Sequence, residues 1–115
     1  MSEQVQRGEA LAVNLSQVVL EGPDGVVWGM DSPQLNANLV KLDAGHEMAE
    51  HVSAQLDVLI VVQGGEGVIT VDDIEHIVQT DSLLLVPAGT RRTIRSTRRL
   101  IYFSIHARRG GLGLS

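Results

Sequence analysis

Short apolar runs that end at turn-forming residues are the feature that most constrains how this 115-residue chain can fold. The runs are rich in Val, Ile and Leu, and Gly, Pro, Asp or Ser follows most of them, which is typical of buried β-strands joined by tight turns. No stretch has a convincing helical periodicity. We expect strands at residues 10–20, 26–30, 35–42, 56–62, 67–71, 74–78, 83–86, 90–95 and 100–106. The pattern predicts an all-β fold, either a sandwich or a barrel.

Two turn signals divide the middle of the chain. The apolar run before Gly64-Gly65 is expected to end in a tight turn there, because no helix follows that would make the glycines a phosphate loop. Asp72-Asp73 separates two β-branched runs, which predicts a hairpin.

The composition predicts one domain with an aliphatic core, since the chain has one Phe, one Tyr and one Trp. We expect a flexible N-terminus at 1–9, a β-barrel at 10–107 and a tail at 108–115. The absence of cysteine excludes disulfides, thiolate chemistry and Cys-type zinc sites. No apolar run approaches the roughly 20 residues of a membrane span, and no secretory signal is visible, so we expect a soluble, cytoplasmic protein.

Charge is unevenly distributed along the chain. All fourteen carboxylates lie between Glu3 and Asp81, whereas seven of the nine basic residues follow residue 90. We expect these arginines to pair with the acidic majority, within one chain or across a dimer. Nucleic-acid binding is disfavoured because no aromatic side chains accompany the arginines for base stacking.

The densest cluster of ionisable and polar side chains precedes the central strand. Its members are His46, Glu47, Glu50, His51, Ser53 and Asp57. Glu47 and Glu50 could serve as a general acid and base, although such a pair is more often a solvated edge. We assign no catalytic residue.

The spacing of this cluster and of a second segment matches a known pattern. The first set of positions is Gly45, His51, Ser53, Asp57 and Gly64, and the second is Asp81, Pro87, Gly89, Arg92 and Ser96. On both spacings the chain resembles a small single-domain cupin of the RmlC-like jelly-roll superfamily. The resemblance implies a double-stranded β-helix, the cupin jelly-roll barrel.

The resemblance also implies positions for a divalent metal, and these have changed. Of the family's ligands only His51 is kept, whereas Ser53, Asp57 and Arg92 occupy the other positions. Serine is a poor neutral ligand, and arginine is a permanent cation without a lone pair to donate. We therefore expect no metal cofactor, and an ion pair between Asp57 and Arg92 in its place.

Arg92 could also be a forked receptor for a carboxylate or phosphate. Because neighbouring residues of a strand point to opposite faces, only one of Arg91 and Arg92 can face the barrel interior, and the motif spacing selects Arg92. We expect a barrel that binds or senses a small polar or anionic molecule, lined by His51, Ser53, Asp57 and Arg92, with Tyr102 and His106 as neighbours.

Two other functions remain open. A metal such as Fe, Mn, Ni or Zn could be held by His46, His51, Asp57 and His106, which would make the protein a metal-dependent enzyme of the dioxygenase or isomerase type. A purely structural or interaction role is the third possibility. Strands 35–42, 56–62 and 83–86 are apolar on both faces, so we expect a homodimer that covers an outer sheet face.

Overall fold

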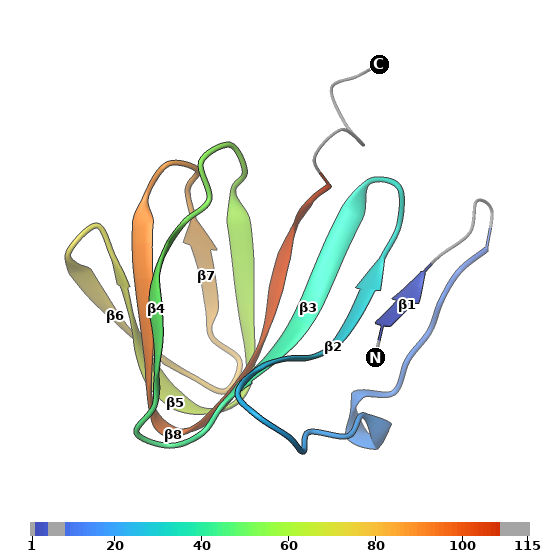
Figure 1. The fold of residues 1–115 in the computed structure, drawn as a ribbon, viewed down its shortest axis with the longest axis horizontal. Coiled ribbons are helices and arrows are strands. Elements are labelled where there is room, and N and C mark those ends of the chain that lie inside the picture. The colour runs from blue at the N-terminus through green and yellow to red at the C-terminus, as the bar shows by residue number, and fades with distance from the viewer. Residues whose placement is uncertain (1, 5–8, 109–115) are drawn as a thin grey trace.

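The computed structural model describes residues 2–4 and 9–108, and its secondary structure is almost entirely strand (Figure 1). In chain order the elements are β1 (Ser2–Gln4), the short 3-10 helix η1 (Leu15–Gln17), β2 (Gly25–Asp31), β3 (Leu35–Leu42), β4 (Glu47–Val52), β5 (Val58–Val71), β6 (Ile74–Gln79), β7 (Leu83–Val86) and β8 (Arg91–Ala107). The predicted all-β class is therefore confirmed. The predicted tail beyond residue 108 lies outside the described residues.

Two long strands, β5 and β8, organise the sheet. They pair with each other antiparallel, from Leu59 opposite Ile105 to Val71 opposite Arg92. The first half of β5 also pairs with β7 and its second half with β6, while β8 pairs first with β4 and then with β3. Figure 1 shows β5 and β8 curving at the base of the molecule, with the other strands rising on either side.

The bend in β5 corrects the prediction of a turn at Gly64-Gly65. The strand continues through these glycines, and the register with β8 shifts on both sides of Gly64. Gly65 has a φ of 82°, a conformation that favours glycine, and its Cα faces the backbone carbonyls of β8. Strands 90–95 and 100–106 are likewise one continuous strand, because residues 96–99 cross the same bend.

Two further expectations were wrong. Residues 10–20 form no strand, and Asn14 instead caps η1 by accepting a hydrogen bond from the Ser16 backbone N–H at 3.0 Å. Conversely, the sequence did not predict β4, because half of its six residues are ionisable and its polar and apolar residues do not alternate. Pairing with β8 stabilises β4 in the folded chain, and this pairing cannot be predicted from the residues of β4 alone.

The core between the two halves of the sheet is aliphatic, as expected. Tyr102 is the one aromatic side chain in a cluster that otherwise consists of valine, leucine and isoleucine. Trp28 is buried but lies outside this cluster. The deepest members include Leu42, Val62, Ile69 and Leu100, each at most 1% exposed.

The segment before β2 is tied to β3 and β8 by two cations. Lys41 is 3% exposed, and its Nζ donates to the Gly22 carbonyl at 2.6 Å and to Asp43 at 3.2 Å. Arg99 donates from Nη2 to the Leu20 carbonyl at 2.7 Å. These bonds to backbone carbonyls attach an irregular segment to a regular sheet.

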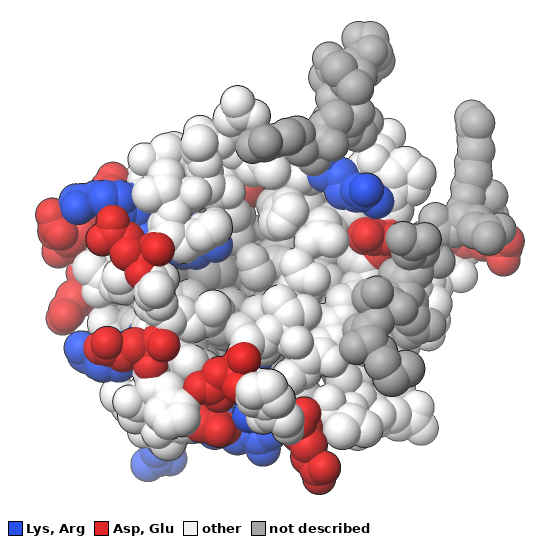
Figure 2. Space-filling view, in the orientation of Figure 1, with Lys and Arg blue, Asp and Glu red and all other residues white. Residues whose placement is uncertain are grey.

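The other C-terminal arginines largely pair within the chain, as predicted. Arg91 contacts Asp73 at 3.2 Å, and Arg108 contacts Asp31 at 3.5 Å. Arg98 lies 3.9 Å from Glu66. Figure 2 shows basic and acidic side chains side by side along one flank of the molecule. Across the described residues, no helix has the length and apolar character that crossing a membrane would require.

We predict that Gly65→Ala destabilises the protein by about 3 kcal/mol or more, because an added Cβ would overlap the Arg99 carbonyl and the positive φ would be strained. Urea unfolding measures the change. Gly64→Ala is the matched control: its Cβ would meet only Ile101, at 3.9 Å, so stability should change by less than about 1 kcal/mol. Equal losses in the two variants would contradict this account of the bend.

Candidate functional site: the barrel cavity

A cavity of about 460 Å³ lies between the two halves of the sheet. Five of the six predicted ligand-binding residues line it, namely His51, Ser53, Arg92, Tyr102 and His106. The sixth, Asp57, does not. The remaining lining residues are Val26, Asn38, Val40, Met48, Ala49, Glu50, Val58, Ile60, Ile94 and Ser104. The cavity thus combines an apolar wall with a few polar groups, as small-molecule sites do.

The bend in β8 explains how residues far apart in the sequence meet here. On the first half of the strand, alternation turns Arg92 and Ile94 inward, and on the second half it turns Tyr102, Ser104 and His106 inward. His51 reaches the cavity because it pairs with Arg92 across β4 and β8. Two segments of one strand therefore supply facing walls.

Two polar residues that sequence reasoning missed complete one wall. Asn38 on β3 lies opposite Ser104 on β8, which in turn lies opposite Ile60 on β5. All three line the cavity. In the alternating pattern of residues 35–42, Asn38 lies on the same strand face as the buried Val40. The sequence alone does not show that this face is the inner one, so it could not place Asn38 in the cavity.

Arg92, rather than Arg91, faces the interior. The Arg91 guanidinium lies outside beside Asp72 and Asp73, and the Asp73 carboxylate raises its pKa. Arg92 is half-buried, and burial lowers its pKa. Its Nη1 atom is buried without a hydrogen-bond partner among the described residues. A buried unpaired donor on a cation is costly, which sets Arg92 apart from the paired arginines of the surface.

Comparisons with solved structures identify the fold. No family model matches the sequence, and no curated protein matches it. Among solved structures, the cupin domain of Cnp3 from Schizosaccharomyces pombe aligns with a TM-score of 0.75 at 19% identity, over 87% of this chain and 75% of that domain. A protein from Bacillus halodurans aligns with a TM-score of 0.75 at 22% identity, over 90% and 84% of the two chains.

A salicylate 1,2-dioxygenase from Pseudoaminobacter salicylatoxidans, solved with gentisate, aligns with a TM-score of 0.63 at 17% identity, over 65% of this chain and 20% of the enzyme. The chain is a small cupin-fold protein. The resemblance drawn from the motif spacing is confirmed at the level of the fold.

The metal-ligand positions of this cupin-fold chain do not present a donor set that fits a divalent ion. Arg92 brings a permanent positive charge into the cavity, and Asp57 is turned away from it. Ser53 contributes a neutral hydroxyl, which leaves His51 as the one strong donor of the original positions. We therefore derive no chemistry from a metal at these positions.

The predicted ion pair between Asp57 and Arg92 does not form. Instead, Asp57 Oδ1 accepts a hydrogen bond from the Ala88 backbone N–H at 2.8 Å. Beside it, the Gly89 N–H donates to the Ser53 carbonyl at 2.9 Å. Because Asp57 is short and immediately precedes β5, its carboxylate reaches the neighbouring loop rather than the cavity. It links the β4–β5 loop to the β7–β8 loop.

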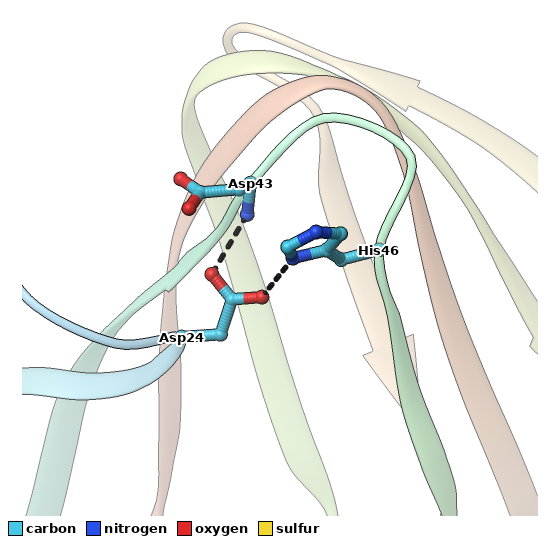
Figure 3. A group of neighbouring side chains, drawn as sticks. All are labelled: Asp24, Asp43 and His46. Atoms are coloured by element: carbon cyan, nitrogen blue, oxygen red, sulfur yellow. Dashed lines mark hydrogen bonds and ion pairs between the residues drawn. The ribbon is translucent and has the colours of Figure 1, made fainter.

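The alternative metal ligands also do not converge. His46 lies in a different place, where its ring contacts Asp24 (Figure 3). Among the described residues, Asp24, Asp43 and His46 form the one group of metal-ligating side chains that lie within 4.8 Å of one another. His46 therefore does not join His51 and His106, both of which line the cavity.

Hydrogen bonds and ion pairs within the chain already satisfy the carboxylates of the group around Asp24. Figure 3 shows the Asp24 carboxylate between the Asp43 backbone nitrogen and the His46 ring. The Asp43 N–H, followed by His46, lowers the pKa of Asp24. The Lys41 ammonium lies 3.6 Å from Asp24 and supplies a positive charge beside both carboxylates. This cluster anchors the N-terminal segment.

Three cavity side chains, those of Asn38, Tyr102 and His106, have hydrogen bonds within the chain. His106 Nδ1 lies 2.9 Å from the Ala107 carbonyl, and because a carbonyl only accepts, this nitrogen carries the proton. Tyr102 is 3% exposed, and its hydroxyl donates to the Met48 sulfur at 3.2 Å. Burial raises the pKa of Tyr102 to about 12, so the phenol remains protonated and a donor at neutral pH.

We predict that Tyr102 titrates near pH 12 in the native protein, against about 10 for an exposed tyrosine. The raised pKa favours the protonated native state, so its stabilising contribution is complete below about pH 10 and is lost as the pH rises toward 12. Phenolate absorbance reports this group alone, because the chain has a single tyrosine. A native titration near pH 10 would contradict the buried placement, and a sample unfolded in urea provides the reference.

Proposed function

We propose that this cupin-fold protein binds a small polar or anionic molecule in the barrel cavity, at Arg92, without the divalent metal of the cupin motif. The observation that carries the proposal is the buried Nη1 atom of Arg92, which has no hydrogen-bond partner among the described residues. A cation held in that state is unfavourable until an anion contacts it, because burial removes water without supplying a partner.

The surroundings of Arg92 support the same proposal. Ser53, Tyr102 and Ser104 bring hydroxyl groups to the cavity, and these can donate to an anion bound at Arg92. The guanidinium presents a planar fork that matches the two oxygens of a carboxylate or phosphate. The volume of about 460 Å³ lies within the usual range of roughly 300–1,000 Å³ for small-molecule sites.

We predict that Arg92→Gln reduces affinity for small anions at least tenfold, because the lost hydrogen bonds are charge-assisted. Calorimetric titration with acetate, benzoate, hexanoate and inorganic phosphate, supported by thermal shift, measures the change. Arg95→Gln is the matched control: it removes the same charge from an exposed position on the same strand. Equal anion affinity in the Arg92→Gln variant and the unmutated protein would contradict the proposal.

Elemental analysis distinguishes the proposed function from the alternative of a metal-dependent enzyme. The protein is incubated with Fe, Mn, Ni and Zn and washed before its metal content is measured. Under the proposed function the protein retains well below one equivalent of each metal. Stoichiometric retention that is lost in His51→Ala would instead favour a metal-dependent enzyme with a non-standard ligand set.

A second candidate role, self-association, is favoured by the outer face of the sheet. Two rows of paired residues cross four strands there. The first row is Ala37, Ile105, Leu59 and Leu85, and the second is Leu39, Phe103, Val61 and Leu83. Neither row contains a charged residue. Leu83 and Leu85 are 68% and 59% exposed.

We propose that a second copy of the chain covers these rows. Because the rows are uncharged, two copies related by a two-fold axis would meet there without opposing like charges. Charged side chains, which discourage association of an exposed sheet, are absent from both rows. Exposed apolar residues that lie together, here Leu59, Leu83 and Leu85, are typical of interaction sites, whereas Leu39 in the second row is already buried within the chain.

We predict that the double variant Leu83→Glu, Leu85→Glu is monomeric, because each dimer would bury four unpaired carboxylates. Size-exclusion chromatography with light scattering at micromolar concentration measures the mass. Ile77→Glu, at an 85% exposed position on β6, makes the same chemical change away from the rows and should leave the dimer intact. A monomeric unmutated protein would overturn this role.

A further inference from the structure

The charge inside the cavity limits the charge of its ligand. Among the described residues that line the cavity, Arg92 is the one permanent cation and Glu50 the one carboxylate. Glu50 is exposed, whereas the unpaired Nη1 atom of Arg92 is buried. A second negative charge on the ligand would enter a largely apolar space with no permanent cation left to meet it. The cavity therefore favours a monoanion.

The wall of the cavity determines what the rest of that monoanion should be. Val40, Met48, Val58, Ile60 and Ile94 line it with aliphatic and thioether groups. Val40, Val58, Ile60 and Ile94 are at most 4% exposed and belong to the core cluster. Only the parts of these side chains that face the cavity are left to cover, and covering them with another apolar surface is favourable, so the wall favours a ligand with an apolar body.

Tyr102 supplies a second donor to the cavity, from the wall that faces Arg92. Its hydroxyl donates to the Met48 sulfur at 3.2 Å. A thioether is a weak acceptor, so turning the hydroxyl toward a carboxylate oxygen would exchange a weak hydrogen bond for a charge-assisted one.

We propose that the ligand is a monocarboxylate with an apolar body, its carboxylate bound by Arg92 and the Tyr102 hydroxyl and its body packed against Met48, Ile60 and Ile94. This inference rests on the proposed function and narrows it to one chemical class. It excludes phosphate and dicarboxylates as preferred ligands, although both would be attracted to a guanidinium on charge alone.

A matched series of probes tests the class by calorimetric titration of the full chain. From acetate through butyrate to hexanoate, affinity should rise about fourfold for each methylene that the cavity buries. Hexanamide keeps the apolar body without the charge, and adipate adds a second carboxylate to a chain of the same length. Each should bind at least tenfold more weakly than hexanoate, and so should inorganic phosphate.

Two variants test the role of Tyr102 with hexanoate as the probe. Tyr102→Phe should weaken binding about tenfold, because a donor to the carboxylate is lost while the ring remains. Thr93→Val removes a hydroxyl from an exposed position on β8 that does not line the cavity, so hexanoate affinity should change by less than about threefold. Thermal unfolding of both variants verifies that they are folded.

The outcomes separate this inference from the proposed function. If Arg92→Gln abolishes anion binding but phosphate, acetate or adipate binds the unmutated protein as tightly as hexanoate, the monocarboxylate class is wrong and the anion site stands. If Tyr102→Phe leaves hexanoate affinity unchanged, the assignment of the second donor is wrong. If none of the anions binds the unmutated protein, both proposals fail together.

Discussion

The antiparallel pairing of β5 with β8 is the interaction on which the rest of the structure depends. It runs nearly the whole length of both strands and shifts register on both sides of Gly64. Gly65 allows the two backbones to approach there with a conformation and a spacing that a side chain would prevent. Because both strands bend at this point, each belongs to both halves of the sheet, and β3, β4, β6 and β7 pair with them on one half or the other.

The bend also creates the cavity and decides what faces it. Alternate residues of β8 point inward before and after the bend, so Arg92 and Tyr102 lie on facing walls although they belong to one strand. A core optimised for stability alone would place an apolar side chain, or a paired one, where Arg92 stands. The unpartnered Nη1 atom is therefore the strongest physical argument that this cupin-fold protein binds an anion.

Charge has a different role on the outside of the sheet. Lys41 is nearly fully buried but fully engaged, with Gly22, Asp24 and Asp43 around its ammonium group. Most of the exposed arginines likewise have carboxylate partners within the chain. These contacts hold the irregular N-terminal segment and the strand edges in place. Arg92 differs from these residues because its buried Nη1 atom has no partner among the described residues, and a buried donor without a partner costs free energy.

The sequence by itself determined the all-β class and the aliphatic core, because hydrophobic alternation and turn residues are local properties, and its motif spacing indicated the cupin fold. Motif spacing favoured Arg92 over Arg91 as the inward residue, but the tertiary structure decided between them. It did not determine β4, the continuity of β5 through Gly64-Gly65 or the partner of Asp57. A mostly exposed strand such as Glu47–Val52 is stabilised by the strand beside it, and a glycine pair is compatible with either a turn or a bend. Asn38 and Ser104 joined the site only through cross-strand register. Contacts between residues distant in the chain decided these features, because hydrogen-bond partners and close backbone approach exist only once the strands have paired.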